Sequence, residues 1–199
     1  MTDLLARMGI NTEDLGCVML DVEPLTELHD AIPSSLWYVN PEKSWASGPT
    51  LDAHVTLLFG LMKSAHVWRE FVDEALEGWT PPPVVDICGL AVFGRDSDPY
   101  DCIVGEVHRK SGFALREANR RLKKLPHVDT FGDYRAHVTV GYVLKGTARL
   151  VMPDLTAIIK ATCRGSPSTT RTASHARAYT DVVLRTATGS INYGDEVTA

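Results

Sequence analysis

The sequence contains few cysteines, and none of them is in a metal-binding pattern. Cys17, Cys88, Cys102 and Cys163 form no Cys-x-x-Cys pair and have no spacing typical of metal ligands. Cys88 and Cys102 lie in apolar stretches, where a free thiol behaves as a small core residue. This cysteine usage is typical of a reducing compartment.

Long apolar runs are also missing. No stretch approaches the length that would cross a bilayer. Residues 1–16, MTDLLARMGINTEDLG, have neither a basic start nor a continuous apolar segment, so we expect no secretory signal. Together with the cysteines, these features predict a cytoplasmic protein without a membrane partner.

Positive charge is in deficit as well. The formal net charge is −5 and the pI is about 5.8, which argues against a broad basic surface that tracks long nucleic acid. Residues 145–199 carry seven Lys and Arg against four acids, which is +3 and leaves −8 for residues 1–144. A local basic region of this kind can attract a small anion, or it can be an ordinary solvated face.

Apolar periodicity predicts an alternation of strands and helices. Expected strands are 17–23, 35–40, 53–59, 84–95, 100–109, 135–143 and 179–187, with helices at 65–77 and 113–125. Residues 154–161 fit either a helix or a strand, and the Ser-, Thr- and Arg-rich residues 164–178 fit a flexible loop or a lid over a cleft.

This order predicts an α+β fold in one bilobal domain, 1–199. The two lobes would be related antiparallel sheets with outer helices and a central cleft. The core would cover about 15–145, and the late strand at 179–187 would complete the second lobe. The sequence does not indicate an oligomeric state.

The sequence Ala-His-Val-Thr occurs twice, each time in an apolar, β-branched run. The first copy is in LDAHVTLLFG (51–60) and the second in RAHVTVGYV (135–143), and the two histidines are 83 positions apart in the sequence. Residues two apart on a strand point to the same face. Each predicted strand therefore presents one imidazole and one hydroxyl, His54 with Thr56 and His137 with Thr139, while its valines face a core.

Two facing imidazoles suit acid–base chemistry near neutral pH. One neutral histidine can accept a proton from the attacking oxygen while the other, protonated, donates to the leaving oxygen. The threonine hydroxyls can donate hydrogen bonds to phosphate oxygens. This set can cleave a phosphodiester without a metal or another cofactor.

The two motifs resemble the paired His-x-Thr/Ser motifs of the 2H phosphoesterase superfamily, over roughly residues 15–145. The resemblance implies that His54 and His137 are catalytic and that Thr56 and Thr139 bind phosphate. It also implies a small substrate: an RNA end with a 2′,3′-cyclic phosphate, a 2′-5′ linkage or a cyclic oligonucleotide signal. Ala136 stands where the family often has proline, and the chain beyond Gly146 is longer than a minimal member needs.

Four further residues are candidates for substrate contacts. Arg135 shares the face of His137 and could contact phosphate. Tyr142 follows His137 by five residues and would need a bulge at Gly141 to reach the same face. Tyr38 and Trp37 could stack on a nucleobase or pack in the core. The remaining histidines are expected on the surface or in local hydrogen bonds: His29, His66, His108, His127 and His175.

Two alternatives stay open. A metal ion could be held by His54, His137, Asp52, Asp133 and Glu106, although the sequence has no His-Glu-x-x-His and no pair of histidines four residues apart. Alternatively, the same cleft could bind and sequester a nucleotide without cleaving it.

Overall fold

The computed structural model describes residues 15–41, 46–62, 65–129, 133–164, 175–176, 178–186 and 189–191. They form two four-stranded sheets in which every strand pair is antiparallel. In spatial order, the first sheet contains β2 (His54–Leu61), β1 (Gly16–Val22), β7 (Ala178–Thr186) and β8 (Gly189–Ile191). The second contains β5 (His137–Leu144), β4 (Tyr100–Val107), β3 (Val85–Phe93) and β6 (His175–Ala176). The predicted α+β class is confirmed.

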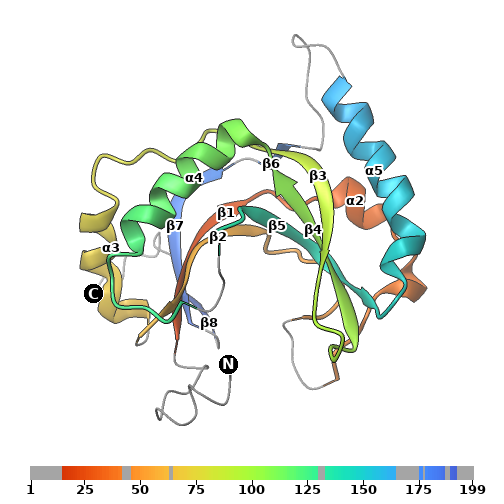
Figure 1. Cartoon of the computed structure of the whole chain (residues 1–199), viewed down its shortest axis with the longest axis horizontal. Helices are drawn as coiled ribbons and strands as arrows, with labels where there is room; N and C mark the ends of the chain where they lie inside the picture. Colours follow the sequence, from red (N-terminus) through yellow and green to blue (C-terminus); the bar gives the residue numbers. More distant parts are fainter. Residues whose placement is uncertain are drawn as a thin grey trace, which may run out of the picture.

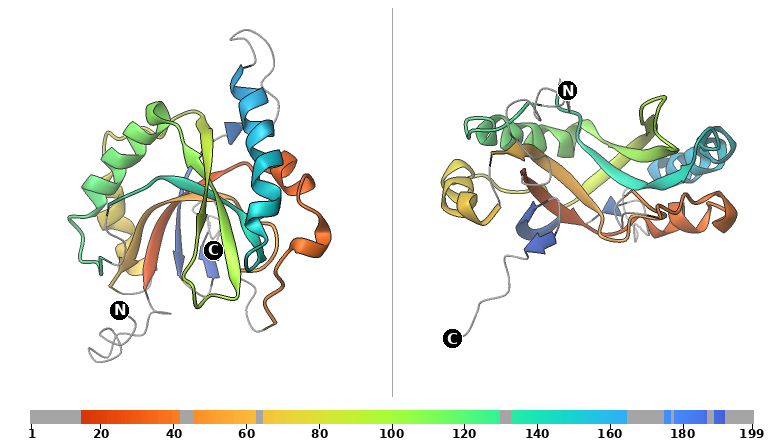
Figure 2. Two further views of the ribbon diagram at one scale, coloured as in Figure 1. Left: turned by 45° about the vertical axis from the view of Figure 1, so that its right-hand side comes forward. Right: turned by 90° about the horizontal axis from the view of Figure 1, so that it is seen from below.

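The sheets curve together into an arch whose outer side carries the helices (Figure 1). Helix α4 (Arg109–Leu122) packs on β2, and α5 (Ala148–Arg164) packs on β3. Figure 2 shows α5 beside α2 (Thr26–Asp30), which it contacts. The other helical segments are η2 (Ser34–Leu36), η3 (Ala65–Trp68) and α3 (Arg69–Ala75). Among the described helices, none combines the length and apolar character of a membrane span.

Two predictions of local structure need correction, and the structure decides a third that the sequence left open. Strand β7 pairs with β1, with Cys17 opposite Arg185, so it completes the first sheet and the prediction that it completes the second lobe was wrong. Residues 35–40 form the end of η2 and a single bridge from Trp37 to Val143 instead of a strand. Residues 154–161 belong to α5, whose signal is weakened because Pro153 lies inside the helix.

The predicted loop 164–178 falls largely outside the described residues, apart from the end of α5 and the short strand β6. Strand β6 pairs with β3, with His175 opposite Asp86. The prediction that this segment closes over a cleft therefore stays a prediction.

The core is shared by the two sheets. Val55 and Leu57 of β2, and Val138 and Val140 of β5, have no exposed surface, as the alternation of the motif strands predicts. All four belong to one hydrophobic cluster with the buried face of α4. Because β2 and β5 are in contact where the sheets meet, the buried valines hold the two motif strands next to each other.

Candidate active site

Strand β2 carries a bulge directly after its His-x-Thr motif. Val18 and Met19 of β1 are neighbours, but they pair with Leu58 and Thr56, so Leu57 is an extra residue on β2. A bulge shifts the alternation of a strand by one residue. Phe59 therefore lies on the same face as His54 and Thr56, and these three side chains are the partly exposed positions of a strand that is otherwise buried.

Strand β5 has the same bulge at the equivalent position. Ile103 and Val104 of β4 pair with Gly141 and Thr139, which leaves Val140 as the extra residue. The burial pattern of β5 matches that of β2 over the first seven residues. Tyr142 is thereby brought to the face of His137. The sequence indicated that Tyr142 would need such a bulge, and the structure places it one residue before Gly141.

A thiol connects Tyr142 with the threonine of the motif. The Cys102 sulfur hydrogen-bonds with the hydroxyls of Thr139 and Tyr142, and burial raises the pKa of this thiol to about 11. Burial also raises the pKa of Tyr142 above its ordinary value, followed by the charges of Cys102 and Tyr100. The hydroxyls of Thr139 and Tyr142 therefore share the Cys102 thiol as a neighbour. The Tyr142 hydroxyl and this thiol both stay neutral near pH 7.

Polar side chains of two helices lie next to the bulged residues. Asn119 of α4 donates from Nδ2 to the Leu57 carbonyl at 2.6 Å. On the other strand, the Val140 carbonyl accepts the Thr50 backbone N–H at 3.0 Å, and the buried His29 imidazole of α2 lies near it. Burial lowers the pKa of His29, so this imidazole is neutral at pH 7. Neither Asn119 nor His29 was predicted as functional, because the sequence around each of them does not show that it lies next to a bulged strand.

Replacing Asn119 by leucine is expected to destabilise the fold by about 1–3 kcal/mol, because the buried Leu57 carbonyl would lose its side-chain donor. Urea unfolding of the full chain measures this free energy. Lys110→Leu, at an exposed position of the same helix, is the control and should change stability by less than about 0.5 kcal/mol. Equal midpoints for the two variants would contradict the anchoring role.

The two motif histidines are oriented in the same way. Nδ1 of His54 lies 2.9 Å from the Asp52 carbonyl, and Nδ1 of His137 lies 2.7 Å from the Arg135 carbonyl. A carbonyl oxygen only accepts, so Nδ1 must carry the proton in both rings. Each neutral imidazole therefore keeps its Nε2 lone pair for proton transfer.

His137 has a perturbed environment. Its pKa is lowered mainly by burial, an effect that the hydrogen bond to the Arg135 carbonyl opposes and the positive charge of His54 reinforces. The two imidazoles thus lie within electrostatic reach of each other. Phe93 of β3 packs edge-on against the His137 ring, with ring centroids 4.9 Å apart, and this fixes the ring plane.

A pocket of about 360 Å³ lies beside His137, whereas His54 and Thr139 are not among its lining residues. It runs from the motif strands to the C-terminal turn of α4 and the segment that leads into β5. Its lining residues are Thr56, Leu57, Leu58, Phe59, Phe93, Asn119, Lys123, His127, Asp129, Asp133, Tyr134, Arg135 and His137. The pocket therefore brings Thr56 of the first motif together with His137 and the predicted phosphate contact Arg135 of the second. His127, Lys123 and Tyr134 were not predicted as site residues.

A row of tyrosines lies next to Thr139. The rings of Tyr38 and Tyr100 are 5.4 Å apart, and those of Tyr100 and Tyr142 are 5.1 Å apart. The Tyr38 backbone N–H donates to the Tyr142 carbonyl at 3.0 Å. Two candidates, Tyr38 and Tyr142, thus lie close together, and Tyr100 of β4, which was not predicted as a site residue, lies between them.

Trp37 has a different position from its neighbour Tyr38. Its ring makes an edge contact with His29, at 6.2 Å between centroids, and it packs against the hydrophobic cluster. A Cβ atom on Gly141 would lie 2.6 Å from the Trp37 ring, so the tryptophan covers the backbone of β5. We give Trp37 a packing role.

The alternative metal-ligand residues are spread over several elements. Glu106 lies opposite His137 in the β4–β5 ladder, while Asp133 lines the pocket. Within the described part of the chain, no three His, Cys, Asp or Glu side chains are grouped so that they could hold one metal ion.

No family model and no curated protein sequence matches this chain. Two structures of Usb1 from Kluyveromyces marxianus are similar to it. The structure with uridine monophosphate has a TM-score of 0.57 and 11% sequence identity, and the alignment covers 92% of this chain and 99% of the Usb1 chain. The other structure has a TM-score of 0.55 and 10% sequence identity, and the alignment covers 91% of this chain and 98% of the Usb1 chain. At this low identity the likeness shows the fold: the chain has the fold of these Usb1 structures over most of its length.

Proposed function

We propose that the protein is a phosphodiesterase that cleaves a small RNA-like substrate by acid–base catalysis. The observation that carries the proposal is the matched orientation of the two histidines, each with Nδ1 on a backbone carbonyl two residues earlier. His127 makes the same contact with the Leu125 carbonyl at 2.8 Å, but only the two motif histidines are also followed by a threonine and a bulge on their strands. The similarity to a Usb1 structure that holds uridine monophosphate supports a nucleotide as the ligand.

The different surroundings of the histidines suggest their roles. His137 is the more natural general base, because burial and the His54 charge lower its pKa and keep Nε2 unprotonated at neutral pH. His54 then acts as the general acid. The coupling favours this division, because a protonated His54 disfavours a second proton on His137.

In the proposed reaction, Nε2 of His137 takes the proton of the attacking hydroxyl as its oxygen forms a bond to phosphorus. The bond from phosphorus to the leaving oxygen breaks, and that oxygen takes the proton from Nε2 of His54. If a ribose 2′-hydroxyl attacks, the product is a 2′,3′-cyclic phosphate; if water attacks a cyclic phosphate, the product is a monoester. Thr56 and Thr139 donate hydrogen bonds to the non-bridging oxygens, where charge develops. Arg135 adds a positive charge beside them.

A substrate panel in the presence of EDTA tests this function. It contains nucleoside 2′,3′-cyclic phosphates, 3′-5′ and 2′-5′ dinucleotides, a short uridine oligomer and cyclic oligonucleotides, with products resolved by chromatography. We expect turnover of at least one class in EDTA, because no step above uses a metal.

The panel also distinguishes the alternatives. Activity that EDTA removes and a divalent cation restores would overturn the metal-independent mechanism. Binding of a panel member without turnover at neutral pH would instead identify a nucleotide-sequestering module, because the same cleft would then hold a ligand that it does not cleave.

A further inference from the structure

Helix α4 carries a concentration of positive charge that the proposed reaction does not use. Residues 109–124, which are the helix and the two residues after it, contain seven Lys and Arg and one acid. This segment is therefore +6 in a chain with a formal net charge of −5, which leaves −11 for the rest. A helix face that is merely solvated more often mixes charges of both signs. Such an imbalance in an acidic protein creates a local attraction for anions.

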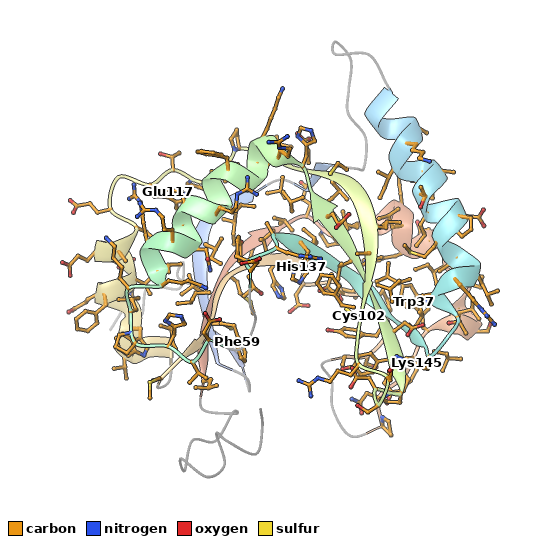
Figure 3. All side chains as sticks on the ribbon, in the orientation of Figure 1. Trp37, Phe59, Cys102, Glu117, His137 and Lys145 are labelled. Atoms are coloured by element: carbon orange, nitrogen blue, oxygen red, sulfur yellow. The ribbon has the colours of Figure 1, made fainter. Side chains whose placement is uncertain are left out.

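The positive charges lie along the outer side of the helix. Leu115, Ala118 and Leu122 form its buried face. Figure 3 shows Glu117 on the outer side of the arch, away from His137. Positions three or four apart share one face of a helix. One exposed row is thus formed by four cations and one aromatic ring, and we call it the α4 stripe: Arg109, Phe113, Arg116, Arg120 and Lys124.

Most cations of the α4 stripe are available to a ligand. Arg120 forms an ion pair with Glu117 at 2.7 Å. Within the described part of the chain, the other three have no acidic partner: Arg109, Arg116 and Lys124. They can contact an anion without first breaking an ion pair.

An exposed aromatic ring lies among these cations. Phe113 is 75% exposed, and the guanidinium carbon of Arg116 lies 6.0 Å from the centre of its ring. Leaving an apolar ring in water has a free-energy cost that a ligand covering the ring would recover. Surfaces that bind single-stranded nucleic acid combine such rings with Arg and Lys, because the ring stacks on an unpaired base while the cations contact phosphates.

The α4 stripe leads to the pocket of the candidate site. Asn119 of α4 and Lys123, the residue after the helix, both line this pocket. Burial raises the pKa of Tyr134, another lining residue, and the Arg116 charge opposes this rise, so a cation of the stripe lies within electrostatic reach of the pocket. At 1.5 Å per residue the stripe is about 22 Å long. This length matches about six phosphates of a stacked strand.

We propose that the α4 stripe binds the phosphate backbone of a single-stranded RNA whose end occupies the catalytic site. The substrate is then the end of an RNA strand that continues along the outer side of α4, and a free mononucleotide uses only the pocket. This inference rests on the proposed function, because that function places the RNA end at the histidines. An anionic membrane is a less suitable partner, since membrane-binding helices insert an apolar face and that of α4 is buried in the core.

The test measures binding without catalysis, so that the RNA stays intact. The full chain with His54→Ala and His137→Ala is titrated with a fluorescein-labelled uridine dodecamer at several salt concentrations, and anisotropy gives Kd. In this background the three cations without an acidic partner are replaced: Arg109→Gln, Arg116→Gln and Lys124→Gln. Each phosphate contact to a single strand contributes about 0.7 to the slope of log Kd against log salt. We therefore expect the slope to fall by about 2, and the affinity at 0.1 M salt to fall by about 10²-fold.

A charge-matched variant is the control: Arg95→Gln, Arg149→Gln and Lys160→Gln. These three cations are exposed and lie outside α4, and their replacement changes the net charge by the same amount. This variant should keep the affinity and the salt slope of its parent. Phe113→Leu should weaken dodecamer binding by about tenfold through lost stacking, but it should leave the salt slope unchanged because the ring carries no charge.

Equal losses of affinity in the two triple variants would overturn the α4 stripe, because only the overall charge would then matter. Vesicles of phosphatidylserine and phosphatidylcholine are a second probe. Vesicle binding that the stripe variant loses while it keeps dodecamer binding would assign the stripe to an anionic membrane instead.

Turnover connects the stripe with the catalytic site. With both histidines intact, the stripe variant should raise KM for the dodecamer, and an unchanged KM would separate the stripe from the site and overturn the proposal. The binding experiment itself does not depend on turnover. A substrate panel without any turnover would thus defeat the proposed function and leave RNA binding by the stripe standing.

Discussion

Replacing either His54 or His137 by alanine is expected to lower kcat/KM by about 10²–10⁴-fold on the best substrate, since one well-placed acid or base contributes that much. The two residues act together in one chemical step, His137 accepting one proton and His54 donating another, so the double variant should be little worse than the worse single variant. Initial rates in EDTA measure this effect. His108→Ala, at the N-cap of α4, is the control and should keep the wild-type rate. Two single variants with full activity would refute acid–base catalysis by this pair.

The pH dependence separates the roles of the two histidines. A general base must be unprotonated, and the pKa of His137 is lowered from 6.5. The acidic limb of kcat/KM should therefore have its midpoint below pH 6.5, with activity lost as the pH falls through it. In His54→Gln the neighbouring positive charge is gone, so the pKa of His137 should rise. An NMR titration of His137 measures this change, and an unchanged titration curve would mean that the imidazoles are not coupled.

Thr56→Val and Thr139→Val are each expected to lower kcat by about 10²–10³-fold. Removing one hydrogen-bond donor that faces developing charge typically has this cost, and valine keeps the shape of the side chain. Thr156→Val, on α5 with its hydroxyl on the Met152 carbonyl, is the control and should leave the rate unchanged. Thermal unfolding of all three variants checks that the fold is retained.

Whether kcat or KM changes in the threonine variants tells what the two hydroxyls do. A rise in KM with an unchanged kcat would mean that the hydroxyls bind the phosphate equally in the ground state and the transition state. That result would contradict a role in stabilising developing charge, although the threonines would still contact substrate.

The motif strands could be predicted from the sequence because their signal is local. Alternation with a period of two places His54 and Thr56 on one face and Val55 on the other, whatever the rest of the chain does. The same holds for His137 and Thr139. The buried valines and the antiparallel sheets follow from this pattern.

The partner of a strand could not be predicted in the same way. The sequence order suggested that the last strand belongs with the second half, but β7 pairs with β1. Pairing depends on edges that are free once the rest of the fold has formed, and β1 has one because β2 covers only its other side. Short apolar strands do not specify such a partner.

By itself, the sequence determined the two His-x-Thr pairs and the strands that present them, because side-chain direction along a strand is a local property. Only the tertiary structure decided what surrounds them. Asn119 comes from a distant helix to donate to the Leu57 carbonyl, and the two bulges turn Phe59 and Tyr142 toward the faces of the motif histidines. A bulge depends on how two strands pair and on which donors reach its free carbonyl, and both are fixed only when the sheets and helices pack together.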